Sequence, residues 1–166
     1  RKESSAASDV YKRQVYAGGM GLVAACDMAV AAEGAGFCLS ETRIGLIPAT
    51  IGPYVVRAMG RRAAQRYLLT AERFDAAEAH RLGLVHTVVA ADGLDAAVDG
   101  LVQALRAAGP QAVRACKRLL REVADRPVDD ALIARTVEGI AEIRASDEGR
   151  AGVSAFLAKQ APPWLP

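Results

Sequence analysis

Two features of the sequence have residue types and spacing that could support chemistry. The first is the glycine-rich segment Gly18-Gly19-Met20-Gly21, which leads into an apolar run without a helix breaker. Glycine allows backbone amides to approach a ligand closely, and a helix start adds a partial positive charge. The second is Glu41, whose carboxylate could carry a proton. Taken alone, the glycines fit a tightly packed turn equally well, and Glu41 fits a solvated loop.

The same glycines match a short dinucleotide-binding pattern. Residues 19–24 read G-x-G-x-x-A, and Glu41 lies 20 residues after Gly21, where that fold places a ribose carboxylate. The pattern needs a continuous buried strand directly upstream, but only Val15-Tyr16-Ala17 separates the glycines from a polar stretch. The strand and helix alternation of a doubly wound sheet is also missing downstream. These observations disfavour nucleotide binding.

Cysteine, histidine and overall charge exclude several other classes of function. Cys26, Cys38 and Cys116 are far apart and form no CxxC pair, and His80 and His86 are the two histidines. This spacing favours buried reduced thiols, structural histidines and no metal site. The formal net charge of +2 and the scattered aromatic residues give no signature of nucleic-acid binding.

The elements that must position these residues fall into three segments. The 166 residues are 52% hydrophobic and 24% charged, which predicts a globular protein with a sizeable core. Residues 1–14 are polar and resemble a non-native or disordered leader. Asp27 interrupts the apolar stretch that follows, which argues against a signal peptide or a membrane span. We therefore expect no membrane partner and a cytoplasmic location.

Residues 15–92 have the pattern of a mixed α/β part, and residues 93–166 that of an all-helical tail. In the first part, Asp75 and Glu78 have capping-box spacing and Gly83 is placed as a helix stop. A tight turn at Glu33-Gly34 separates two buried strands. Expected strands are 28–32, 36–39 and 84–89, with helices at 22–26, 53–58, 61–69, 76–82, 94–107, 110–123, 128–145 and 147–159.

Several segments carry a family pattern in their order and spacing: Ala17 to Gly21 with Cys26-Asp27, Phe37 to Pro48, Leu69 to Ala76, Ala79 to Val85, and Glu148 to Arg150 with Ala155 to Lys159. Together these segments resemble the crotonase (enoyl-CoA hydratase/isomerase) superfamily. The similarity covers nearly everything after residue 14, and residues 47–57 look most like bacterial methylglutaconyl-CoA hydratases of leucine breakdown. It implies an α/β fold, with the C-terminal part of a ββα spiral core at 15–92 and a helical oligomerisation and CoA-capping region at 93–166.

The resemblance implies a site for an acyl-CoA thioester, with CoA as part of the substrate and no separate cofactor. Gly18 aligns with a glycine whose amide stabilises an enolate oxygen, and Glu41 with a carboxylate that moves the proton at the α carbon. A carboxylate in a mostly apolar cleft suits acid and base work near neutral pH. Arg43 and Arg57 could meet a substrate carboxylate or form salt bridges with nearby acidic residues. The other implied substrate-binding residues are Gly19, Gly21, Pro48, Phe156 and Lys159.

Phe156 and Lys159 align with residues that approach the CoA adenine and phosphate of a neighbouring subunit. The resemblance thus implies a homotrimer, or a homohexamer built as a dimer of trimers. A core phenylalanine and a solvated lysine are the alternatives that the residues themselves allow. The family's earlier segment, with its second oxyanion amide, is not matched by residues 1–14. We therefore expect a carboxyl-terminal fragment that is weak or inactive by itself.

Gly21 departs from the family pattern, because many enoyl-CoA hydratases have a second glutamate at this position. We therefore expect chemistry with one carboxylate. The leading hypothesis is a lyase of fatty-acid or leucine metabolism that hydrates a 2-enoyl-CoA, either 3-methylglutaconyl-CoA or a short-chain thioester. The alternatives are an isomerase that shifts a double bond and an inactive helical assembly module.

Overall fold

The computed structural model describes residues 14–165, which fall into two units divided between Val98 and Asp99. Of the predicted leader, residues 1–13 lie outside the described residues, whereas Gln14 belongs to the first strand and not to a leader. The division after residue 92 that the sequence pattern favours stays a prediction. Each unit is described by itself below.

The strands of the first unit form two small sheets. The strands β1 (Gln14–Tyr16), β3 (Gly36–Cys38) and β4 (Phe74–Asp75) lie in the order β1-β3-β4, and β2 (Val30–Ala32) pairs with β5 (Thr87–Val89). The pairs β1-β3 and β2-β5 are parallel, and β3-β4 is antiparallel. The predicted turn between β2 and β3 is confirmed by a 2.9 Å bond from the Ala35 amide to the Ala32 carbonyl. The two strands that it joins lie in different sheets.

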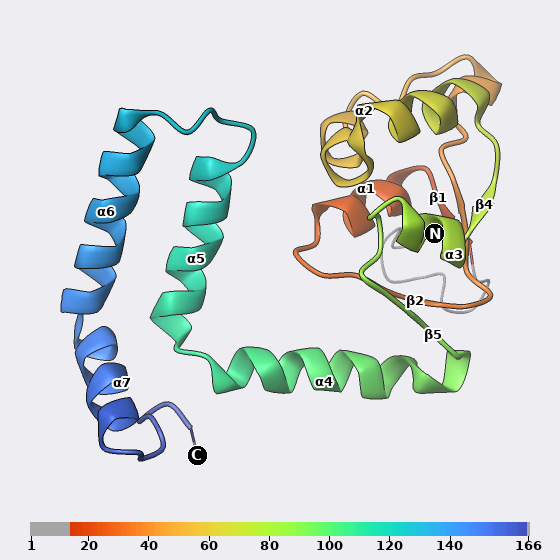
Figure 1. Ribbon diagram of the computed structural model, residues 1–166. Coiled ribbons are helices and arrows are strands. Elements are labelled where there is room, and N and C mark those ends of the chain that lie inside the picture. The colour runs from red at the N-terminus through yellow and green to blue at the C-terminus, as the bar shows by residue number, and fades with distance from the viewer. Residues whose placement is uncertain (1–13, 166) are drawn as a thin grey trace, which may run out of the picture. The chain divides into compact units, whose positions relative to one another are not determined.

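Helices cover the three-stranded sheet of this unit (Figure 1). Its helices are α1 (Gly18–Ala25), α2 (Gly52–Thr70) and α3 (Ala76–Arg81), with 3₁₀ turns η1 (Glu41–Ile44) and η2 (Ala91–Gly93). Gly60, at φ 76° and ψ 154°, kinks α2 where the sequence predicted a break between two helices. The predicted cap of α3 is also confirmed, because the Asp75 carboxylate accepts a 2.8 Å bond from the Glu78 amide.

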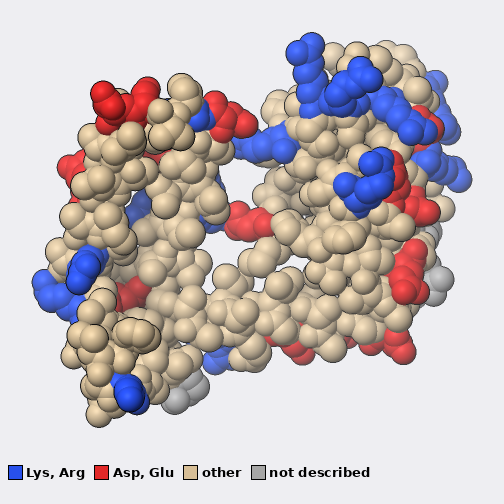
Figure 2. All heavy atoms as spheres, in the orientation of Figure 1, with Lys and Arg blue, Asp and Glu red and all other residues tan. Residues whose placement is uncertain are grey.

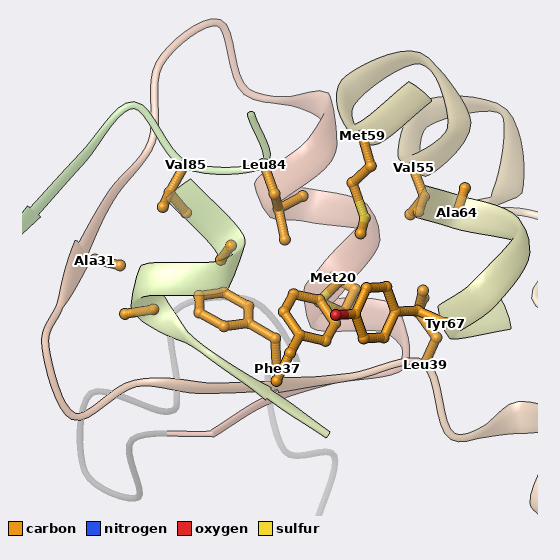
Figure 3. Packing of buried hydrophobic residues seen from close by; sticks show 13 residues of the cluster. Met20, Ala31, Phe37, Leu39, Val55, Met59, Ala64, Tyr67, Leu84 and Val85 are labelled. Atoms are coloured by element: carbon orange, nitrogen blue, oxygen red, sulfur yellow. The ribbon is translucent and has the colours of Figure 1, made fainter. Parts of the chain in front are cut away.

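The core of the first unit is apolar and connects the sheet to all three helices (Figure 3). Phe37 of β3 stacks on Phe74 of β4 at a centroid distance of 5.6 Å, and Tyr67 of α2 lies 4.3 Å from Phe74. Met20 of α1 is completely buried. Burial of one such side chain contributes about 1.5–3 kcal/mol, so this cluster holds α1 against the sheet.

The second unit is helical. α4 (Leu94–Ala107) crosses into it and is followed by α5 (Pro110–Val123), α6 (Asp130–Ala145) and α7 (Asp147–Leu157). Within the unit α5 and α6 lie side by side, and α7 contacts both (Figure 1). The predicted bounds of α4 and α5 are confirmed, and α6 and α7 are each two residues shorter than expected. Pro110 accounts for the start of α5. The Asp129 carboxylate accounts for the start of α6, because it accepts a 2.8 Å hydrogen bond from the Leu132 amide.

The cysteines differ from the prediction, whereas both histidines contact backbone. Cys38 is buried and its thiol donates to the Ala71 carbonyl at 3.3 Å, but Cys26 and Cys116 are exposed. The prediction of buried thiols is therefore wrong for two of the three, because Cys26 lies at the end of α1 and Cys116 lines an open hollow between α5 and α6. His86 accepts a 3.1 Å bond from the Ala29 amide, and His80 Nδ1 lies 3.2 Å from the Val85 carbonyl oxygen.

Candidate active site

Gly18 and Glu41 follow neighbouring parallel strands at the same edge of the sheet. Tyr16 ends β1 opposite Cys38, which ends β3, and the Ala17 amide donates to the Cys38 carbonyl at 3.1 Å. The carboxyl ends of parallel strands share one edge, and adjacent strands lie about 4.8 Å apart. Gly18 lies two residues beyond one strand end and Glu41 three residues beyond the other. The topology therefore brings the predicted amide and the predicted carboxylate to one place.

Gly18 is the first residue of α1, so its amide has no acceptor within the helix. The Met20 amide, in contrast, bonds to the Ala17 carbonyl at 2.9 Å. A Cβ at Gly18 would meet no atom within 4 Å, so the backbone here borders open space among the described residues. The helix start adds a partial positive charge, which favours an anionic oxygen at this amide. The predicted start of this helix at Leu22 is corrected to Gly18.

Ala17, which precedes this amide, has an unusual backbone conformation. Its φ of 46° and ψ of −116° lie outside the regions that an alanine favours. Strain of this kind costs of order 1–3 kcal/mol and is concentrated at functional sites, where the surrounding structure enforces it. The Ala17 bond to Cys38 and the helix that follows supply that constraint. No pattern in the sequence indicated this strain, since alanine gives no signal for a positive φ.

Glu41 begins η1 and is partly buried. Its Oε2 atom is fully buried and has no hydrogen-bond partner among residues 14–165. The turn that carries it is held by the Leu46 amide, which donates to the Glu41 carbonyl at 3.1 Å, and by Gly45 at φ 75°. A buried acceptor without a partner is costly, by about 1–3 kcal/mol, and is therefore rare outside functional sites. A ligand proton or water could supply the missing partner.

Gly21 lies one helical turn after Gly18, on the same face of α1. It is buried, and a Cβ at this position would lie 2.7 Å from the Cβ of Ile51. Pro48 helps to position Ile51. Its carbonyl accepts a 2.7 Å hydrogen bond from the Gly52 amide, which closes the turn that contains Ile51 and precedes α2. Ile51 was not identified from the sequence, where an isoleucine in a breaker-rich loop has no distinguishing pattern.

The structure thus groups five of the seven predicted site residues in the first unit: Gly18, Gly19, Gly21, Glu41 and Pro48. Phe156 and Lys159 belong to the second unit. Phe156 is 80% exposed on α7, and Lys159 follows that helix with φ 54°. Their predicted contacts with CoA stay predictions. A core position for this phenylalanine within its own unit is excluded by its exposure.

Basic side chains gather over α2 on the first unit (Figure 2). Arg57 is exposed there, as is Arg43 in η1, so their predicted contact with a substrate carboxylate stays a prediction. Glu78 of α3 has a different role, because it accepts hydrogen bonds from Arg81, at 2.6 and 2.7 Å, and from Tyr67, at 2.7 Å. The bonds from Arg81, then Tyr67, lower the pKa of Glu78 to about 2. This network connects α2 to α3, so the Glu78 carboxylate has a structural role.

Within the described part of the chain, His, Cys, Asp and Glu side chains form no group of three that could hold a metal ion. The helices of that same part include none with the length and apolar composition needed to cross a bilayer.

Comparisons with known proteins extend over most of the chain. An enoyl-CoA hydratase of Alternaria alternata is 35% identical over 142 residues, covering 85% of this chain and 47% of the relative. A mevalonyl-coenzyme A hydratase of Aspergillus fumigatus is 35% identical over 154 residues, covering 90% and 56%. The chain therefore spans about half the length of these curated relatives.

A solved structure also matches most of the chain. The crystal structure of an enoyl-CoA hydratase from Shewanella pealeana matches with a TM-score of 0.87 and 47% identity, covering 91% of this chain and 56% of that one. The sequence model of enoyl-CoA hydratase/isomerase matches residues 12–165. With its mixed α/β part and helical C-terminal part, the chain has a crotonase fold, and it belongs to the enoyl-CoA hydratase/isomerase family.

Proposed function

We propose that the protein containing this chain is a lyase that adds water to a 2-enoyl-CoA thioester. The observation that carries the proposal is that Gly18 and Glu41 follow the adjacent carboxyl ends of β1 and β3. In addition, the buried Oε2 atom of Glu41 has no hydrogen-bond partner among the described residues. The names of the relatives support the same reaction type. CoA enters as part of the substrate, and the reaction as proposed uses no separate cofactor.

The proposed mechanism divides the work between the amide and the carboxylate. The oxygen of water bonds to C3 of the thioester, and the C2=C3 electron pair moves toward the thioester oxygen, which becomes enolate-like. The Gly18 amide and the start of α1 stabilise that negative charge. Glu41 takes the proton that water releases and delivers a proton to C2 as the thioester carbonyl re-forms.

The acyl group is the finer part of the proposal. We favour either 3-methylglutaconyl-CoA, a substrate of leucine breakdown, or a short-chain enoyl-CoA of fatty-acid metabolism. We also propose that the protein works in the cytoplasm. Residues 47–57 support the first substrate through their resemblance to methylglutaconyl-CoA hydratases. One relative is named for mevalonyl-CoA, so relatives of equal identity to this chain carry names with different acyl groups.

Isomerisation of an enoyl-CoA is the second candidate. Converting a 3-enoyl-CoA to a 2-enoyl-CoA needs one group that takes a proton from C2 and returns one to C4, which a single carboxylate can do. The contact between Gly21 and Ile51 favours this candidate, because it leaves no room for a second acidic side chain one turn from Gly18.

We also propose that the helical unit assembles the protein into a homotrimer or homohexamer. Ile133, Val137 and Ile140 recur at helical spacing on α6 and are 48%, 61% and 63% exposed. An apolar face of this kind supports an assembly role. A non-catalytic assembly module would keep this face and lack affinity for CoA thioesters.

Product analysis in heavy-oxygen water separates the two reactions. The full-length protein is incubated with crotonyl-CoA, 3-methylglutaconyl-CoA and a 3-enoyl-CoA, and the products are examined by mass spectrometry. A hydratase adds two mass units beyond ordinary water in the hydroxyl of its product, whereas an isomerase returns a 2-enoyl-CoA without the label. Folded protein that converts none of the three thioesters would contradict both candidates.

A further inference from the structure

Ile51 occupies the space beside the α1 face that carries Gly18 and Gly21. A Cβ at Gly21 would lie 2.7 Å from the Ile51 Cβ and closer still to its Cγ2. Real Cβ atoms do not approach so closely, so no side chain fits at position 21 while Ile51 keeps its place. The nearest atom is on a β-branched carbon next to the backbone, and a change of rotamer would leave the Cβ contact unchanged.

The backbone of Ile51 is fixed on both sides. Its carbonyl accepts 3.0 Å bonds from the amides of Tyr54 and Val55, which start α2. Directly after it, the Gly52 amide donates to Pro48. The Ile51 side chain also packs against the buried core cluster that includes Met20 of α1. Ile51 therefore forms a fixed apolar surface, not a mobile side chain.

We propose that Ile51 is a specificity-determining residue that forms the apolar wall of the acyl site and limits the acyl group to short chains. The inference rests on the proposed function, since it places the acyl group beside the Gly18 amide. An isoleucine here gives the thioester's hydrocarbon part an apolar contact and takes up the volume that a longer chain would need. A single methylene in such a pocket changes selectivity by roughly 10–200-fold.

The experiment compares two substrates that differ in chain length. kcat/KM is measured for crotonyl-CoA and for 2-decenoyl-CoA with the full-length protein and its Ile51→Ala, Ile51→Val and Leu120→Ala variants. We expect Ile51→Ala to raise the ratio of decenoyl to crotonyl turnover at least about 10-fold, and Ile51→Val to have a smaller effect in the same direction. Leu120→Ala removes an exposed apolar side chain from α5 and should leave the ratio unchanged.

A stability cycle tests the contact itself without any substrate. Gly21→Ala should lower the thermal unfolding midpoint by several degrees in the wild-type background, and by less than half as much in the Ile51→Gly background, which lacks both the Cβ and the Cγ2 of Ile51. Equal losses in the two backgrounds would overturn the contact on which the inference stands.

The outcomes also separate this inference from the proposed function. Turnover of crotonyl-CoA by the wild type, together with an unchanged ratio in Ile51→Ala, would overturn the role of Ile51 and leave hydration standing. A folded wild-type protein that converts neither of these thioesters nor 3-methylglutaconyl-CoA would refute the proposed function and the acyl wall with it.

Discussion

Replacing Glu148 with glutamine should destabilise the helical unit, although Glu148 lies far along the chain from the helix that it caps. Its carboxylate, on α7, accepts from the amides of Gln111 at 3.0 Å and Ala112 at 2.9 Å. These two are among the N–H groups that the start of α5 leaves without helical acceptors, and Pro110 has none to satisfy. One side chain therefore completes α5 and holds α7 against it.

The size of the effect follows from these two bonds. A hydrogen bond to a charged group contributes about 1.5–3 kcal/mol, and a negative charge at a helix start about 0.3–1 kcal/mol. Glutamine keeps one acceptor oxygen and loses the charge, and Glu148 is only partly buried. We therefore expect Glu148→Gln to lower the free energy of unfolding by about 1–2 kcal/mol, and Glu148→Ala to lower it by more.

Urea unfolding followed by circular dichroism measures this loss. Glu142→Gln is the matched control, because Glu142 is an exposed glutamate on α6 whose carboxylate lies 3.8 Å from the Arg135 guanidinium. An exposed ion pair of this kind contributes about 0–1 kcal/mol. If Glu148→Gln is no more destabilising than Glu142→Gln, the capping argument is refuted.

Three further predictions concern pH and packing. The pKa of Glu78 lies at about 2 in the fold, below the value of a free glutamate. The contribution of Glu78 to the stability of the fold is therefore present above about pH 4.5 and is lost as the pH falls toward 2. Glu78→Gln should weaken the dependence of the free energy of unfolding on pH over that range. Phe37→Ala empties a buried position stacked on Phe74 and should cost about 3–5 kcal/mol in urea unfolding. Gly149→Ala would place a Cβ 3.1 Å from the Arg144 Cα and should lower the unfolding midpoint, whereas Gly100→Ala, in open space within α4, should raise it.

The sequence predicted the helices best where the local signals were strong. Amphipathic spacing and Pro110 located α4 and α5, Asp75 located α3, and Gly60 located the kink of α2. Each of these signals acts within a few residues, through a cap, a missing amide or a backbone conformation. They do not depend on the rest of the fold.

Features that depend on distant residues were not predictable in this way. The strands at 30–32 and 36–38 are neighbours in sequence, but their partners are β5 and the pair β1 and β4. The exposure of Cys26 and Cys116 reflects which faces other elements leave uncovered. At the site, Gly18 and Glu41 were found through a family resemblance, whereas Ile51 and the strained Ala17 became visible only with the tertiary contacts.

The most direct test of the central claim is the rate of hydration after replacement of Glu41 in the full-length protein. We predict that Glu41→Gln lowers kcat/KM for the preferred enoyl-CoA by about 10²–10⁴-fold, because it removes proton transfer and keeps the size of the side chain. CoA binding and the unfolding midpoint should stay close to those of the wild type. A Glu41→Gln variant that retains more than about a tenth of the wild-type rate would contradict the assignment of Glu41 as the acid and base of this site.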